Sequence, residues 1–147
     1  MKPIQVVSAN KGDFDELLTM SRRLWKNTPE DQIIKDLHTT LEAKNAEILI
    51  ARQEEVAGFI TVSIRTEYVE GCTSSPVGYI EAIYIKDQFR LEGIARSLVQ
   101  AGEDWARQKG CTEMGSDTWL WNKEAQAFHL SVGYKEEDTL VHYIKRL

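Results

Sequence analysis

Apolar residues recur along the chain with two different spacings. Short runs rich in β-branched and aromatic residues predict strands at 4–9, 46–52, 56–69, 78–86 and 111–120. Apolar residues three or four positions apart predict helices at 12–25, 28–43, 94–109 and 122–133. The last run, "YKEEDTLVHYIKRL" at 134–147, is typical of a final strand or hairpin.

This succession of elements predicts an α/β fold with a mixed sheet. Consecutive strands without a helix between them favour an antiparallel middle, whereas the long helix between strands 78–86 and 111–120 favours a right-handed parallel crossover. Helices are expected on both faces of the sheet. At 147 residues, with no repeat or polar linker, the chain is expected to form a single domain covering 1–147.

Two of the predicted helices carry signals at their starts. Asp13 is placed to cap the first helix, because its carboxylate can accept a bond from a free backbone N–H. Thr28 is placed to cap the second, with Pro29 in its first turn. The inner stripe of the second helix is formed by Ile33, Leu37 and Leu41.

Composition and charge exclude several kinds of partner. The formal net charge is −5 and the basic residues are scattered, which argues against nucleic acid and anionic membranes and is compatible with a cationic ligand. The start lacks a signal-peptide core and no stretch of about 18 apolar residues exists, so a cytoplasmic location is expected. Cys72 and Cys111 lack a CxxC or histidine partner, so we expect ordinary thiols and no metal site.

One carboxylate interrupts an apolar strand. Glu81 lies within "GYIEAIYIKDQFR", which otherwise reads as a buried strand, and burying an unpaired carboxylate costs several kcal/mol. Two interpretations remain open. Glu81 can form an ion pair with Arg65 on the adjacent strand, or it can serve as a proton acceptor in a site.

The junction after this strand has the features of an anion site. In "FRLEGIA" an apolar strand gives way to a helix, whose first N–H groups lack partners and whose dipole is positive there. Gly93 removes a Cβ, Ala95 is small, and Arg90 and Arg96 can add positive charge. A plain strand, loop and helix without a ligand remains the alternative. Neither GxxxxGK[ST] nor GxGxxG occurs in the chain.

"RLEGIA" resembles the R/Q-x-x-G-x-G/A loop with which the Gcn5-related N-acetyltransferase (GNAT) family holds the pyrophosphate of coenzyme A. The stretches "EYVEGCTSSPVGYIEAIYIKDQFR", "GCTEMGSDT" and "HLSVGYKEED" are similar to the aminoglycoside 6'-N-acetyltransferases of that family. The resemblance implies a GNAT fold with splayed central strands four and five. It also implies acetyl-CoA as cosubstrate and an aminoglycoside as acceptor.

The resemblance further implies how the cosubstrate is held. The pantetheine arm would pair with strand four like an added strand, through backbone groups of Ile83, Tyr84 and Ile85. The residues implied to wrap the pyrophosphate are Leu91, Glu92, Gly93, Ile94, Ala95 and Arg96. Asn122 matches an asparagine that contacts the pantetheine arm, although a simple helix cap is the alternative for this residue.

The acceptor side is implied in the same way. Glu81 would take a proton from the amine and help to bind the substrate, while the Ile83 N–H would polarise the thioester carbonyl. Asp117 and Asp138 match acidic positions of the aminoglycoside pocket, with solvated turn carboxylates as the alternative. The remaining implied contacts are Trp25, which could instead belong to the core, Tyr68, and Thr28, which stands where relatives can have a histidine.

The chain departs from the wider family at one catalytic position. Many members carry a tyrosine four residues before the glycine that follows the fourth helix, as general acid to the thiolate; here that residue is His129. We expect His129 to serve in packing or hydrogen bonding near the thiol, with protonation of the sulfur by its imidazolium as the alternative. A thiolate with a pKa of about 8 to 9 hardly needs a proton donor at neutral pH.

With this resemblance, three functions are open. The first is acetyl transfer to the 6'-amine of an aminoglycoside by direct attack in a ternary complex, because no cysteine is placed for a ping-pong route. The second is acetyl transfer to a polyamine, a peptide N-terminus or a small metabolite. The third is a non-catalytic acyl-CoA-binding module. The alternation in "LVHYIKRL" favours a homodimer paired through this segment.

Overall fold

The computed structural model describes residues 3–147, which form one five-stranded sheet and four α-helices with two short 3-10 turns. The elements, in chain order, are β1 (Gln5–Ser8), η1 (Lys11–Asp13), α1 (Phe14–Leu24), α2 (Glu30–Glu42), β2 (Ala46–Arg52), β3 (Val56–Arg65), β4 (Val77–Ile85), η2 (Asp87–Phe89), α3 (Ile94–Gln108), β5 (Met114–Ser116) and α4 (Lys123–Ser131). Within these residues, no helix has the length and apolar character needed to cross a bilayer.

The sheet confirms the predicted mixed α/β architecture. Its strands lie in the order β1-β2-β3-β4-β5. The first four pair antiparallel, and α3 carries the chain from β4 to β5, which pair in parallel. Sequential strands are therefore neighbours throughout, as short connections favour.

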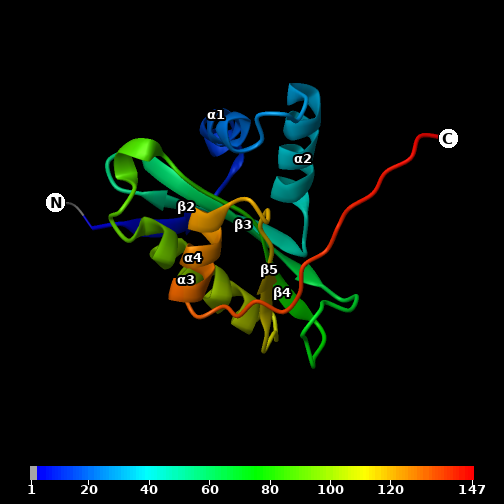
Figure 1. Ribbon diagram of the computed structural model, residues 1–147. Coiled ribbons are helices and arrows are strands. Elements are labelled where there is room, and N and C mark those ends of the chain that lie inside the picture. The colour runs from blue at the N-terminus through cyan, green and yellow to red at the C-terminus, as the bar shows by residue number, and fades with distance from the viewer. Residues whose placement is uncertain (1–2) are drawn as a thin grey trace.

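Helices cover both faces of the sheet. Figure 1 shows α1 and α2 above the strands and α3 and α4 below them. Leu17, Ile33, Leu37 and Phe59 belong to a buried cluster on the α1 and α2 side, with Leu41 partly buried against it, so the predicted stripe of α2 is confirmed. A second cluster on the α3 side includes Ile60, Val62, Ile80, Ile94 and Leu98. The sheet thus separates two apolar layers.

The helix caps differ from the prediction. Asp13 precedes α1, but its carboxylate does not cap that helix: it accepts the Asn10 N–H at 3.0 Å and pairs with Arg52 at 2.8 Å. The start of α2 has no side-chain cap, and Pro29 rather than Thr28 occupies the N-cap position. Because Pro29 is extended, with φ −57° and ψ 140°, the helix begins one residue later than expected.

Three predicted strands differ from the structure. β3 ends at Arg65 instead of 69 because the chain then turns into the loop 66–76. β5 covers only Met114–Ser116 of the predicted 111–120, since β4 diverges from it beyond Ile80. Residues 134–147 contain no helix or strand, and Figure 1 shows their end pointing away from the body. A strand needs a partner, and the described chain provides none there.

Candidate active site

One edge of β4 lacks a strand partner over half its length. Gly78, Tyr79 and Ile80 pair with β5, and the stretch from Ala82 to Ile85 pairs with β3 only. Among residues 3–147, no strand pairs with the other side of this stretch. The predicted splay between strands four and five is therefore present. An extended ligand arm can pair with such an edge as an added strand.

A β-bulge places Glu81 at the start of this free edge. Thr61 pairs with Ala82 and Val62 pairs with Ile80, so Glu81 is the extra residue of β4. A bulge re-aims its side chain and bends the strand. The side chain of Glu81 is 34 % exposed, so the expectation of a buried carboxylate is wrong. The bulge turns it out of the apolar core that its neighbours form.

The carboxylate of Glu81 is bound by two side chains of β3. Ser63 Oγ donates to Oε2 at 2.5 Å. Arg65 donates from Nη2 to Oε1 at 2.7 Å, and from Nε and Nη2 to Oε2 at 3.2 and 3.1 Å. The ion pair with Arg65 that the sequence left open is thus confirmed. Oε2 receives three donors and Oε1 receives one, which leaves Oε1 with room for a further donor.

Arg65 also reaches a second carboxylate through Tyr79. Its guanidinium carbon lies 3.4 Å from the centre of the Tyr79 ring, and the Tyr79 hydroxyl donates to Asp117 Oδ2 at 2.5 Å. Burial and the bond to Asp117 raise the pKa of Tyr79 above its ordinary value, so the phenol remains a donor. Glu81 of β4 and Asp117, which directly follows β5, are therefore joined through one arginine and one tyrosine.

The charge of Arg65 is reinforced by this arrangement. Burial alone lowers its pKa, but the hydrogen bond and the charge of Glu81, with smaller contributions from Tyr79 and Asp117, together raise the pKa above the usual value. The guanidinium is thus a permanent cation between two anions. This cluster of two carboxylates, Glu81 and Asp117, and one guanidinium, Arg65, is therefore net negative.

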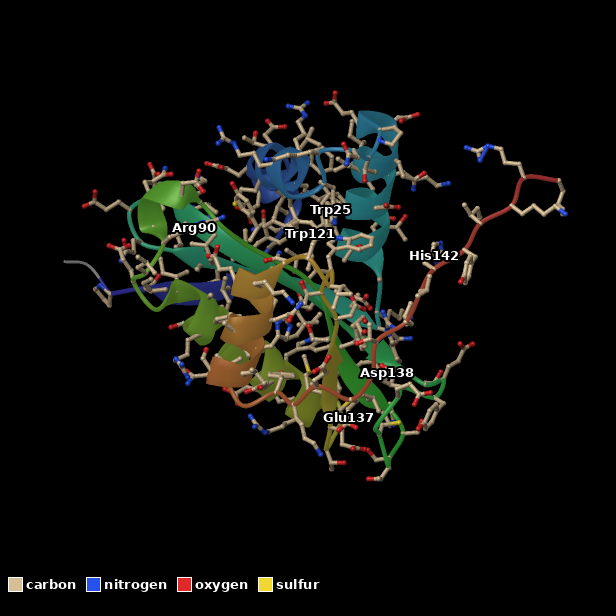
Figure 2. The ribbon with its side chains drawn as sticks, in the orientation of Figure 1. Trp25, Arg90, Trp121, Glu137, Asp138 and His142 are labelled. Carbon is tan, nitrogen blue, oxygen red and sulfur yellow. The ribbon has the colours of Figure 1, made fainter. Side chains whose placement is uncertain are left out.

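The other predicted acceptor residues lie outside the helices and strands. Trp25 follows the end of α1 and is partly exposed, and the Thr28 N–H donates to its carbonyl at 3.2 Å. Tyr68 lies in the loop 66–76 with 70 % of its surface exposed. Asp138 follows Glu137, which packs on Gly71 of the same loop. Figure 2 shows Asp138 on the C-terminal segment beyond α4 and Trp25 after the end of α1.

The structure adds residues that the sequence did not single out. Tyr79 lies two positions before Glu81, and the i, i+2 spacing along one strand could have indicated it. Trp119 and Trp121 follow Asp117 and are largely exposed, although Trp119 lies in the segment 111–120 that was predicted as strand. Figure 2 labels Trp121 on the segment that leads into α4.

The loop before α3 has the backbone of an anion site. Gly93 occupies the N-cap position with φ 79°, in the left-handed region, and no side chain caps α3. Leu91 also has a positive φ, 64°, and its side chain is fully exposed, whereas Ile94 is buried. A Cβ on Gly93 would meet no atom within 4 Å, so conformation rather than packing favours glycine. The first N–H groups of α3 remain free for an anion.

The arginines near this loop are tied to α4. Arg96 Nη2 donates to the Ser131 carbonyl at 3.1 Å. Arg90 lies 3.3 Å from Asp87 and 3.7 Å from Glu124, and Figure 2 shows it ahead of α3. These contacts connect the start of α3 with both ends of α4. The exposed Glu92 has no comparable bond to the loop backbone among the interactions of the described residues.

Asn122 caps the start of α4, and His129 links this helix to β5. The Asn122 side chain accepts the Ala125 N–H at 3.0 Å, which confirms the predicted cap. His129 Nδ1 lies 2.7 Å from the Ala125 carbonyl, so this nitrogen is the donor. Its Nε2 lies 2.7 Å from Ser116 Oγ and accepts that hydroxyl in the neutral ring. Both ring nitrogens are therefore engaged inside the protein.

Comparison with known proteins gives a consistent picture. The sequence profile of the Acetyltransferase (GNAT) family matches residues 13–134. An aminoglycoside N(6')-acetyltransferase type 1 from Salmonella typhimurium is 37 % identical over 138 residues, which cover 93 % of this chain and 95 % of the relative. One of the same name from Acinetobacter haemolyticus is 33 % identical, covering 98 % of this chain and 99 % of the relative.

Solved structures agree with these relatives. The aminoglycoside N-acetyltransferase AAC(6')-Iy in complex with CoA superimposes with a TM-score of 0.94 at 33 % identity, covering 100 % of this chain and 97 % of the other. AAC(6')-Iy with the bisubstrate analogue CoA-S-monomethyl-acetylneamine gives a TM-score of 0.92 at 34 % identity, covering 99 % of both chains. The similarity therefore extends over the whole sheet and all four helices.

Proposed function

The chain belongs to the acetyltransferase (GNAT) family, and on that premise we propose that it transfers an acetyl group from acetyl-CoA to the 6'-amino group of an aminoglycoside. The observation that carries this proposal is the full-length similarity to AAC(6')-Iy, whose solved complexes contain CoA and a bisubstrate analogue. Such an activity would make the protein a determinant of antibiotic resistance.

The free edge of β4 and the start of α3 suit acetyl-CoA. We assign the pantetheine arm to the backbone of Ile83, Tyr84 and Ile85, because this stretch has no partner on its β5 side. The pyrophosphate falls to residues 91–96, where the positive φ values of Leu91 and Gly93 shape the loop and the helix N–H groups are free. Asn122, fixed as the cap of α4, contributes an amide to the arm.

We assign the acceptor amine to a position beside Glu81, at the bulge of β4. Only a neutral amine can attack the thioester carbonyl, so the protonated amine must first lose a proton, and Glu81 Oε1 is the oxygen with room to receive it. The amine nitrogen then forms a bond to the carbonyl carbon, the carbon–sulfur bond breaks, and the nitrogen loses its second proton to water or to the departing sulfur. The Ile83 N–H stabilises the oxyanion, and the departing sulfur leaves as thiolate or takes a proton from water.

Acidic and aromatic residues around this point suit a polycationic sugar. Asp117 and Asp138 each offer a carboxylate to an ammonium group, a contact worth about 1.5 to 3 kcal/mol. Trp25 and Tyr68 offer exposed rings for the apolar face of a sugar and for cation–π contacts. The Thr28 hydroxyl adds a polar contact near Trp25.

One observation favours a second candidate, the non-catalytic acyl-CoA-binding module. The ion pair between Glu81 and Arg65 accounts for Glu81 without any catalysis. The two candidates differ in turnover. We expect acetyl-CoA consumption with kanamycin or tobramycin; consumption only with polyamines or peptides would indicate another acceptor, and binding of acetyl-CoA without turnover would favour the module.

We further propose a homodimer formed through the segment 134–147. Leu140, Val141, Tyr143 and Ile144 are all exposed and alternate with polar residues, a pattern that a second copy can cover by strand pairing. Light scattering should give twice the monomer mass for the whole chain and the monomer mass after deletion of 140–147. We place the reaction in the cytoplasm, where acetyl-CoA is available.

A further inference from the structure

Among residues 3–147, Arg65 contacts both Glu81 and Tyr79, the tyrosine that holds Asp117. On one side its Nε and Nη2 groups hold Glu81, with the shortest distance 2.7 Å. On the other side its flat face lies 3.4 Å from the centre of the Tyr79 ring, whose hydroxyl holds Asp117 at 2.5 Å. Arg65 of β3 therefore links Glu81 and Tyr79 of β4 with Asp117, which follows β5.

We propose that Arg65 is a positioning residue for acetyl transfer, which fixes Glu81 for the reacting amine and Tyr79 with Asp117 for a second ammonium group of the substrate. This inference rests on the proposed function. Arg65 does not touch the reacting atoms in this role. It acts through Glu81 on the chemical step and through Tyr79 on the binding of the acceptor.

The hydrogen-bond pattern of Glu81 supports the first half of this role. Arg65 and Ser63 together saturate Oε2, so an incoming N–H donor is directed to Oε1. A guanidinium is planar and presents its donors as a rigid fork, so it fixes the plane of the carboxylate as well as its position. A lysine at this position would keep the charge but would lose the fork.

The stacking on Tyr79 supports the second half. The Tyr79 ring is largely buried, and its position over the sheet is limited by Gly115, where a Cβ would come within 2.9 Å of the ring. The guanidinium of Arg65 covers a face of the ring. The phenol is thereby held so that its hydroxyl meets Asp117, and the carboxylate keeps its free oxygen for a cation. Removing the hydroxyl should release Asp117 without disturbing Glu81.

Arg52 provides a matched control. It pairs with Asp13 at 2.8 Å, and its side chain is 40 % exposed, against 41 % for Arg65. Its ion pair joins β2 to the turn before α1, at the side of the sheet away from β5. Loss of either arginine removes one ion pair of a partly exposed guanidinium, and the carboxylate left behind is 13 % exposed for Asp13 and 34 % exposed for Glu81. Only Arg65 is expected to affect catalysis.

The test is steady-state kinetics of Arg65→Met, Arg65→Lys, Tyr79→Phe and Arg52→Met with acetyl-CoA and kanamycin, alongside Glu81→Gln. We expect Arg65→Met to lower kcat about 100-fold and Arg65→Lys about tenfold, because small misplacements of a reacting group are costly. Tyr79→Phe should raise the KM for kanamycin about tenfold with a smaller change in kcat. The KM for acetyl-CoA should stay within about twofold throughout, and melting temperatures should match Arg52→Met.

The outcomes separate this inference from the proposed function. A wild-type protein that acetylates no aminoglycoside would overturn both. An active wild type with an inactive Glu81→Gln variant, but with Arg65→Met and Arg65→Lys as active as Arg52→Met, would overturn the inference alone. If Arg65→Met fails to fold, the other two variants decide the question: Arg65→Lys by its lower kcat and Tyr79→Phe by its higher KM for kanamycin.

Discussion

Arg65 Nη2 lies 2.7 Å from Glu81 Oε1, across the pair of strands in which Glu81 is the extra residue of a bulge. The bulge comes directly after Ile80, the last residue of β4 that pairs with β5. The carboxylate, its arginine and the open strand edge therefore meet at one point. This arrangement explains why a charged residue stands within an otherwise apolar strand.

Glu81→Gln should lower kcat with kanamycin by at least about 100-fold, because general base catalysis typically contributes 10²- to 10⁴-fold. Acetyl-CoA affinity, measured by calorimetry, should change little, since the β4 edge and the α3 loop are intact. The exposed hairpin residue Glu55 provides the control, and Glu55→Gln should match the wild type. Full activity of Glu81→Gln would show that Glu81 is a structural ion-pair partner only.

Asp117→Asn should raise the KM for aminoglycosides about tenfold or more. The reason is the loss of a charge-assisted contact worth about 1.5 to 3 kcal/mol, with Tyr79 left to donate to a neutral oxygen. Initial rates over a range of kanamycin concentrations measure the effect. Asp104→Asn, on the exposed face of α3, should have no effect. Equal KM values for both variants would remove Asp117 from the acceptor site.

Gly93→Val should weaken acetyl-CoA binding and destabilise the fold by about 1 to 3 kcal/mol, because valine does not tolerate a φ of 79°. Gly93→Asn should lose less acetyl-CoA affinity and less stability, since asparagine adopts the left-handed region more readily. Calorimetric titration with CoA and thermal melting give the two readouts. Equal losses for valine and asparagine would indicate that bulk, and not backbone conformation, decides this position.

The stability contribution of Glu113 should depend on pH. Hydrogen bonds from the Ser74 hydroxyl and the Thr73 N–H lower the pKa of this carboxyl below its usual value, and they tie the loop 66–76 to the start of β5. A folded pKa below the unfolded one gives stability that is present above the unfolded value, 4.5, and is lost as pH falls through the folded value.

The measurement for Glu113 compares melting temperatures of the wild type and Glu113→Gln from pH 7 down to about pH 3. The wild type should melt at a higher temperature at pH 7, and the difference should shrink as the pH falls below 4.5. A difference that stays constant over this range would mean that the charge of Glu113 does not hold the loop.

The sequence was a good guide to local elements and a poor guide to features that depend on pairing between strands. The stripe of Ile33 and Leu37 predicted α2, because helix periodicity is a local property. The bulge at Glu81 was not predictable, since it depends on the register between β3 and β4. The ion pair with Arg65 was identified as an alternative, but its connection to Asp117 through Tyr79 requires the folded sheet.

The errors at strand ends have a related cause. The residues 117–120 are apolar enough for a strand, but β4 no longer lies beside them, so Trp119 and Trp121 are exposed instead. The segment 134–147 alternates like a strand and has no neighbour within the described chain. Propensity alone cannot supply a partner strand.

The central claim is that the amine at the 6' position of an aminoglycoside is acetylated at the bulge of β4. Its most direct test is to incubate the purified protein with acetyl-CoA and kanamycin and to identify the modified nitrogen by two-dimensional NMR of the isolated product. We expect a single acetyl group on the 6'-nitrogen and none with the Glu81→Gln variant. An unmodified antibiotic, or an acetyl group on another amine, would contradict the claim.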